Sequence, residues 1–250
     1  MSKSIPDYSV SPSGVFDHII AFAVGFGIGF LILFIFYKIL ILSFFGGAVF
    51  GIFNIFSASQ KAVVKRKYKL RIQFFDLLEA MSVAMRAGNP PLKALQSARE
   101  DLRLIYAENS DIITELDIFI GRFNNAVPLS ESFADFAKRS GLEDINNFAA
   151  IYATIEGKSS RAEEIVRETQ QIISDKIEIE MEIETMMAAA KNQGNIMLAM
   201  PLVILAVIGY AGAGFMDAIY TAEGRPVATI GLAIFIVSYF LMQKFSDIKP

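Results

Sequence analysis

Two long apolar blocks, one near each end of the chain, constrain its fold more than any other feature. The first covers residues 16–56 and is almost unbroken apolar sequence, interrupted by Lys38. A helix rises about 1.5 Å per residue and the hydrocarbon core of a bilayer is about 30 Å thick, so this block is too long for one crossing. It predicts two membrane-spanning helices, residues 16–37 and 39–56, with Lys38 at the turn between them.

The second block has the same form. Residues 196–215 and 227–242 are apolar, and a polar segment over residues 217–226 separates them. The chain is therefore predicted to span a membrane four times, with two spans on each side of a middle region. The overall composition agrees, since 54% of the 250 residues are hydrophobic and the mean hydropathy is +0.45.

Basic residues predict the orientation of the spans. A cluster of six follows directly after the second span, while the two outer loops hold only Lys38 and Arg225. Cytoplasmic flanks carry the excess of Lys and Arg, so the middle region and both termini are expected in the cytoplasm. Beside a span, such a cluster is expected to bind membrane lipids and not nucleic acid. Its members are Lys61, Lys65, Arg66, Lys67, Lys69 and Arg71.

The middle region itself is acidic. Residues 72–191 hold 12 Lys and Arg against 21 Asp and Glu, a net charge of −9. A surface of that sign repels phosphate backbones, which is a second reason to expect no nucleic-acid partner.

Helix stop and start signals recur through the middle region. Gly88 is expected to end one helix and Pro91 to begin the next, because glycine accepts the left-handed conformation and proline suits the first helical turn. Ser110 is expected to cap a further helix, and Pro128 to follow its end. Gly157 and Ser160 form a third joint, since Ser160 and Glu163 have the spacing of a capping box.

The letters Gly157-Lys158-Ser159 also end the phosphate-binding loop of many nucleotide-binding proteins. That loop requires a glycine where this chain has Tyr152, and a strand before it where this chain has helical periodicity. We therefore expect a helix joint and no nucleotide site. The chain has no Cys, and no nucleophile, base and orienting group can be assembled from its residues. No catalytic, cofactor or metal site is expected, and the chain is predicted not to be an enzyme.

These signals predict an all-α polytopic membrane protein, with four transmembrane helices and a cytoplasmic bundle of six helices. The expected segments are an N-terminal tail (1–15), two spans (16–56), the cytoplasmic domain (57–194), two more spans (195–243) and a C-terminal tail (244–250).

The stretch at residues 174–185 is a candidate interaction surface. Its strict alternation is formally a strand pattern, but no turn separates it from the helical sequence on either side, so a helix is expected. On a helix the apolar side chains form two stripes parted by two acidic ones. We hypothesise that one stripe packs on the bundle and the other on a second subunit; the alternative is a solvated helix with incidental charges. The surface comprises Ile177, Glu178, Ile179, Glu180, Met181, Glu182, Ile183 and Glu184.

Taken in order, four segments resemble the type II secretion F domain, in the four-span form of the TadB and TadC proteins of tight-adherence pilus machines. They are RAGNPPLKALQSA (86–98), the turn at 125–133, IEGKSSRAEEIV (155–166) and AAAKNQGNIMLAMPLVI (188–204). The resemblance covers roughly residues 74–201. The chain departs from the family twice: Asn125-Ala126 stands where glycine is preferred, and the last helix of the middle region is acidic where relatives are often basic.

The resemblance implies a non-enzymatic platform in the cytoplasmic (inner) membrane. Its expected partners are a cytoplasmic hexameric secretion ATPase, prepilin subunits, and a paralogous platform protein or a second copy of itself. The ATPase would hydrolyse ATP, and the middle region would pass the motion on to pilins drawn from the membrane. A transporter subunit and a membrane-anchored signalling scaffold are the alternatives that the sequence leaves open.

Overall fold

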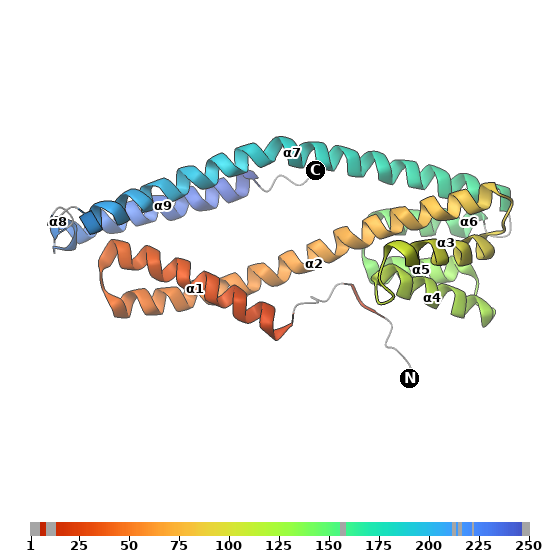
Figure 1. The fold of residues 1–250 in the computed structure, drawn as a ribbon, viewed down its shortest axis with the longest axis horizontal. Coiled ribbons are helices and arrows are strands. Elements are labelled where there is room, and N and C mark those ends of the chain that lie inside the picture. Colours follow the sequence, from red (N-terminus) through yellow and green to blue (C-terminus); the bar gives the residue numbers. More distant parts are fainter. Residues whose placement is uncertain are drawn as a thin grey trace. The chain divides into compact units, whose positions relative to one another are not determined.

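The structure is a computed structural model that describes residues 6–8, 14–155, 159–211, 214, 217–221 and 223–246. In these residues every regular element is a helix, which confirms the all-α fold class (Figure 1). The helices are α1 (Val15–Tyr37), α2 (Leu40–Arg86), α3 (Pro91–Ile105), α4 (Asp111–Asn124), α5 (Leu129–Ser140), α6 (Glu143–Ile155), α7 (Ser159–Ala211), α8 (Asp217–Tyr220) and α9 (Gly224–Ser246).

The chain divides into two compact units. The core unit contains residues 60–178 together with the described N-terminal residues 6–8, and the apolar unit contains residues 14–59 and those from 179 onward. Helices α2 and α7 belong to both units, and each continues from one to the other without a break in the helix (Figure 1).

Aromatic side chains build the centre of the core unit. The rings of Phe119 and Phe133 have centroids 4.9 Å apart, and Phe133 meets Phe148 edge-on at 5.0 Å. Phe136 adds a contact to Phe119 at 5.7 Å. These rings come from α4, α5 and α6, each of which buries residues three or four positions apart. The spacing of the apolar residues along each helix is thus what assembles the core.

The joint after α2 and the joint after α4 each use a left-handed residue. Gly88 has a φ of 90° between α2 and α3, and Ala126 has a φ of 62° between α4 and α5. The same hydrogen bond closes both turns: Asn89 N–H donates to the carbonyl of Ala84, and Val127 N–H to that of Arg122. The left-handed conformation costs a residue with a Cβ atom about 1–2 kcal/mol. Ala126 therefore destabilises this turn relative to the glycine that the family prefers.

Pro91 opens α3, and Pro128 directly precedes α5. The residues 156–158, and with them Gly157, lie outside the described part of the chain. Helix α6 ends at Ile155 and α7 begins at Ser159, so Ser160 lies inside the first turn of α7 and not before it.

Helices α1 and α2 pack closely in the apolar unit. A Cβ atom added at Gly29 would lie 2.7 Å from the Cβ of Phe50, and one at Gly47 would lie 3.0 Å from the carbonyl oxygen of Phe26. Small residues on both helices therefore set the spacing of this pair, as they do in many membrane proteins. The turn between the helices is at Lys38, which has a φ of 48°.

The segment around α8 and α9 contacts that turn. The Tyr220 hydroxyl donates to the carbonyl of Ile35 at 3.0 Å, and the ammonium of Lys38 lies 4.7 Å from the centre of the Tyr220 ring. Tyr37 and Thr229 share a hydrogen bond of 2.8 Å. The turn at Lys38 and the segment around Tyr220, which the sequence predicts to lie outside the membrane, therefore meet within the apolar unit.

Four helices are long and apolar enough to cross a membrane. They are Val15–Tyr37, Leu40–Arg86, Arg161–Tyr210 and Gly224–Met242, in agreement with the four predicted spans. Most of their apolar side chains are exposed in the protein itself, which is what a lipid-facing surface requires.

Candidate interaction surface and polar cluster

The candidate surface lies on α7, which is helical through residues 174–185 despite the alternating pattern. Ile177 is half-buried against the core, whereas Ile179 and Met181 keep 55% and 52% of their surface exposed. Ile183 is half-buried. Each predicted apolar stripe thus has one half-buried and one exposed member, and neither is buried as a whole.

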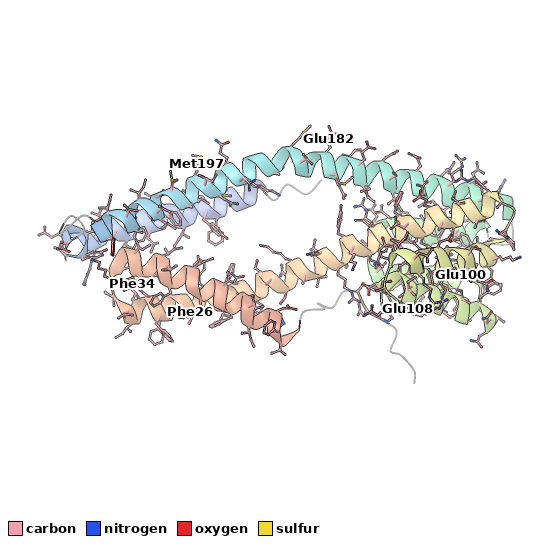
Figure 2. All side chains as sticks on the ribbon, viewed as in Figure 1. Phe26, Phe34, Glu100, Glu108, Glu182 and Met197 are labelled. Carbon is pink, nitrogen blue, oxygen red and sulfur yellow. The ribbon has the colours of Figure 1, made fainter. Side chains whose placement is uncertain are left out.

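The acidic residues of this surface differ among themselves. Glu178 and Glu182 are exposed and form no ion pair within the described residues. Glu180 is half-buried, and the side chain of Glu184 lies outside the described part of the structure. Figure 2 shows the Glu182 side chain projecting from α7. The two free carboxylates are therefore available to a partner.

Within the basic cluster after the second predicted span, the arginines and the lysines have different surroundings. Arg66 pairs with Asp111 at 2.8 Å, and Arg71 pairs with Asp144 at 2.8 Å. Both pairs lie within the core unit, so these two arginines fix α2 to α4 and α6. The lysines behave differently: Lys61, Lys65 and Lys69 are exposed, and among the described residues none of them has an acidic partner.

A polar cluster that the sequence did not reveal lies inside the core unit. The carboxylate of Glu115 is fully buried, and the guanidinium of Arg139 donates to both of its oxygens at 2.5 and 2.6 Å. The hydroxyl of Tyr8 donates to the same carboxylate at 2.6 Å. A buried charge is tolerated only when it is paired and hydrogen-bonded, and this arrangement meets both conditions.

The N-terminal segment is held to the core unit through this cluster. Tyr8 is fully buried, its N–H donates to the carbonyl of Arg139, and Arg139 in turn donates to the carbonyl of Pro6. The guanidinium of Arg66 lies 4.7 Å from the centre of the Tyr8 ring. Residues 6–8 thus belong to the core unit.

One signal in the sequence could have located the cluster. Glu115 lies three residues after Ile112 and one before Leu116, in the middle of the apolar stripe of α4. A carboxylate in such a stripe requires a buried partner. Nothing local identifies that partner, because Tyr8 and Arg139 lie 107 and 24 positions away.

The surroundings shift several pKa values in the core unit. Burial, and then the charge of Glu115, raise the pKa of the Tyr8 hydroxyl well above its usual value of 10. Burial works to lower the pKa of Arg139, but its bonds to Glu115 outweigh this and raise it. Burial and a hydrogen bond to Asp76 raise the pKa of Tyr106. All three groups thus hold their protons in the folded state.

No group of three or more His, Asp or Glu side chains is placed to hold a metal ion in the part of the chain that the structure describes. The features described above are the candidate surface on α7 and the buried ion pairs of the core unit. They can bind a partner or hold helices together.

Comparison with known proteins identifies the family. Residues 77–209 match the family described as type II secretion system (T2SS), protein F. The match covers more than half of the 250 residues, from α2 in the core unit through α3 to α6 and into the apolar part of α7. No curated protein and no solved structure matches the chain. With four apolar helices, the match indicates a membrane platform protein of type II secretion or type IV pilus-like systems. The chain belongs to the type II secretion system protein F family.

Proposed function

We propose that the chain is a TadB/TadC-like platform protein, which couples a cytoplasmic hexameric secretion ATPase to the extraction and assembly of prepilin subunits. The core unit would be its cytoplasmic six-helix domain and would receive the motion, while the apolar unit would meet pilins in the bilayer. In this role the chain catalyses no reaction itself. Its further partner is a paralogous platform protein or a second copy.

The observation that carries the proposal is the continuity of α2 and α7. Each helix contains a candidate span and a segment that packs in the core unit, with no break between them. A hydrogen-bonded helix keeps its length, because every residue is fixed to the one four positions away. Two such helices can carry a displacement of the core unit into the membrane.

The N-terminal segment supports the proposed topology independently of charge. Residues 6–8 belong to the core unit, where Tyr8 is fully buried, and residues 60–86 of α2 belong to the same unit. The chain between them must therefore leave the core unit and return on the same side of the membrane, which requires an even number of crossings. Two spans, α1 and the first part of α2, fit this requirement.

We expect cysteine labelling in intact cells to report this topology. The chain has no native Cys, so a single introduced Cys gives an unambiguous signal. Glu223 lies in the outer loop before α9 and Asn109 in the loop between α3 and α4, and both are exposed. Glu223→Cys should react with a membrane-impermeant maleimide, and Asn109→Cys should react only after the cells are opened. The reverse pattern would invert the proposed orientation.

Deletion of the gene in its native host tests the function. The proposal predicts loss of surface filaments, or of secretion by the same machine, with recovery on expression of the intact chain. Purification of the tagged full chain from that host should recover a secretion ATPase. A liposome assay in which the purified chain moves a solute would favour the transporter, and recovery of a regulator without the ATPase would favour the scaffold.

A further inference from the structure

We propose that residues 6–8 position α1: they hold its start to the core unit, so that α1 follows the core unit when that unit moves. These residues are called the docked segment below. The connection is derived from contacts within the core unit and from the length of the chain. Its use in filament assembly rests on the proposed function.

The docked segment is held at each of its three residues. The Nη1 atom of Arg139 donates to the carbonyl of Pro6 at 3.1 Å, and Nη1 of Arg66 donates to the carbonyl of Asp7 at 3.4 Å. The N–H of Tyr8 donates to the carbonyl of Arg139 at 3.3 Å. Hydrogen bonds to the main chain at consecutive residues fix the backbone of the segment and not only one side chain.

The Tyr8 side chain attaches the segment to three helices. Its hydroxyl bonds to Glu115 of α4, its ring meets Phe136 of α5 edge-on at 6.2 Å, and the guanidinium of Arg66 in α2 lies over the same ring. Withdrawal of Tyr8 would expose a buried ring and leave a buried carboxylate with one partner fewer, and both are costly. The docked segment therefore moves with the core unit.

The length of the chain limits how far α1 can lie from this site. Seven peptide units join Tyr8 to Val15, the first residue of α1. An extended chain spans at most about 3.3–3.6 Å per residue, so the start of α1 lies within about 25 Å of Tyr8. This limit follows from the covalent chain and holds for every arrangement of the two units.

Helix α1 is itself packed closely on α2 within the apolar unit. A Cβ atom added at Gly25 would lie 2.6 Å from the Cβ of Asn54, one helical turn from the contact between Gly29 and Phe50. The core unit is thus connected to the same pair of helices twice, through α2 itself and through the docked segment. A long helix resists extension but can bend. A second connection opposes bending of α2 where the units join, so that a displacement reaches α1 and α2 together.

A change in the length of the connection tests this role without altering the Tyr8 site. Ten Gly and Ser residues inserted between Ser11 and Pro12 lengthen the chain between the docked segment and α1. A flexible insert of that length adds about 17 Å of root-mean-square span. The matched control carries the same ten residues between Ser4 and Ile5, before the docked segment, and leaves the length of the connection unchanged.

Distances between two spin labels report the restraint directly. Labels are attached at Phe16→Cys in α1 and Asn109→Cys in the core unit of the full-length chain, which has no native Cys, and are measured in nanodiscs by double electron-electron resonance. The insert after Ser11 should widen the distribution of distances about twofold, because the added slack becomes available to the core unit. The control insert should leave the distribution as it is in the native chain.

A second pair of labels separates movement of the core unit from its unfolding. Asn109 and Lys138 are both exposed and both belong to the core unit. Labels at these two positions should give the same distribution in the native chain and in both insertion variants, because the cost of closing a loop grows only slowly with its length and the segment stays docked.

Filament counts in the native host then test the use of the connection. The insert after Ser11 should reduce the number of filaments severalfold, and the control insert should not. An unchanged distribution for the Phe16 and Asn109 labels would overturn the connection, and a wider distribution with normal filament counts would overturn its role in assembly. Failure of the proposed function is a separate result: filaments would persist after deletion of the whole gene, while the distances would still report the restraint.

Discussion

Replacement of Arg139 by Met is expected to destabilise the folded chain by about 3–5 kcal/mol, the range for a buried ion pair that loses one partner. The Glu115 carboxylate is fully buried and receives two hydrogen bonds from Arg139. Without the guanidinium it must stay charged in an apolar core or take up a proton, and both are costly. Denaturant unfolding of the full-length chain in detergent, followed by circular dichroism, measures the loss.

Two variants separate this cause from a simple loss of packing. Adding Glu115→Gln to Arg139→Met should restore part of the stability, because it removes the unpaired charge. Arg103→Met serves as the matched control: Arg103 pairs with an exposed Glu108, and such pairs contribute at most about 1 kcal/mol. No recovery with Glu115→Gln, or an equal loss in the control, would contradict the assigned role.

The stability that Tyr8 contributes to this cluster depends on pH. The pKa of the Tyr8 hydroxyl is raised in the folded state. The stability that the protonated hydroxyl contributes is therefore fully present below the unfolded pKa of about 10 and is lost as the pH rises from there through the folded pKa. Tyr8→Phe leaves one hydrogen bond to a buried carboxylate unmade, at about 1–3 kcal/mol. The variant should therefore be less stable at neutral pH and lose less stability on going to alkaline pH.

Local signals in the sequence predicted most of the helices. The apolar blocks gave the four candidate spans, because the length of an apolar run is a property of consecutive residues. The glycine and proline joints at Gly88, Pro91 and Pro128 lie at the ends of helices in the structure. The turn at Ala126 adopts the same left-handed geometry although it lacks glycine, so the joint forms without the residue that local preference favours.

Contacts between distant residues could not be predicted in this way. The pairs of Glu115 with Tyr8 and Arg139 join three separate segments, and periodicity within one helix carries no information on which segments meet. The six basic residues that follow the second predicted span, and that lie within α2, show the same limit. Counting them predicted orientation, but the structure places Arg66 and Arg71 in ion pairs of the core unit. The run of charges that predicts the topology therefore also contributes to packing.

Ser59→Pro is expected to abolish filament assembly while leaving the chain folded and inserted. Ser59 is the last residue of α2 in the apolar unit, and the core unit begins at Gln60. Proline there removes the hydrogen bond from residue 59 to the carbonyl of Ile55 and clashes with that carbonyl, which kinks or breaks the helix at a cost of about 3 kcal/mol or more. Filament counts in the native host, beside the amount of chain in the membrane fraction, provide the measurement.

Helix α2 is the better place for this test because α7 already contains Pro201 in its apolar part, whereas α2 has no proline. Ser59→Ala is the matched control, since it keeps the helix and loses only the bond from the Ser59 hydroxyl to Ile55. Cysteine labelling at Glu223 and Asn109 in the Ser59→Pro chain verifies that its topology is intact.

A graded series distinguishes transmission through α2 from simple anchoring of the core unit. Ser59→Gly leaves the backbone bond in place but softens the helix by about 1 kcal/mol relative to alanine. If motion passes along α2, assembly should fall in the order alanine, glycine, proline, because each step weakens the continuity of the same helix. If α2 only ties the core unit to the membrane, all three chains should assemble filaments equally once their amounts in the membrane are matched. Equal assembly would therefore remove helix continuity as the basis of the proposed coupling and leave the membrane anchor as the role of α2.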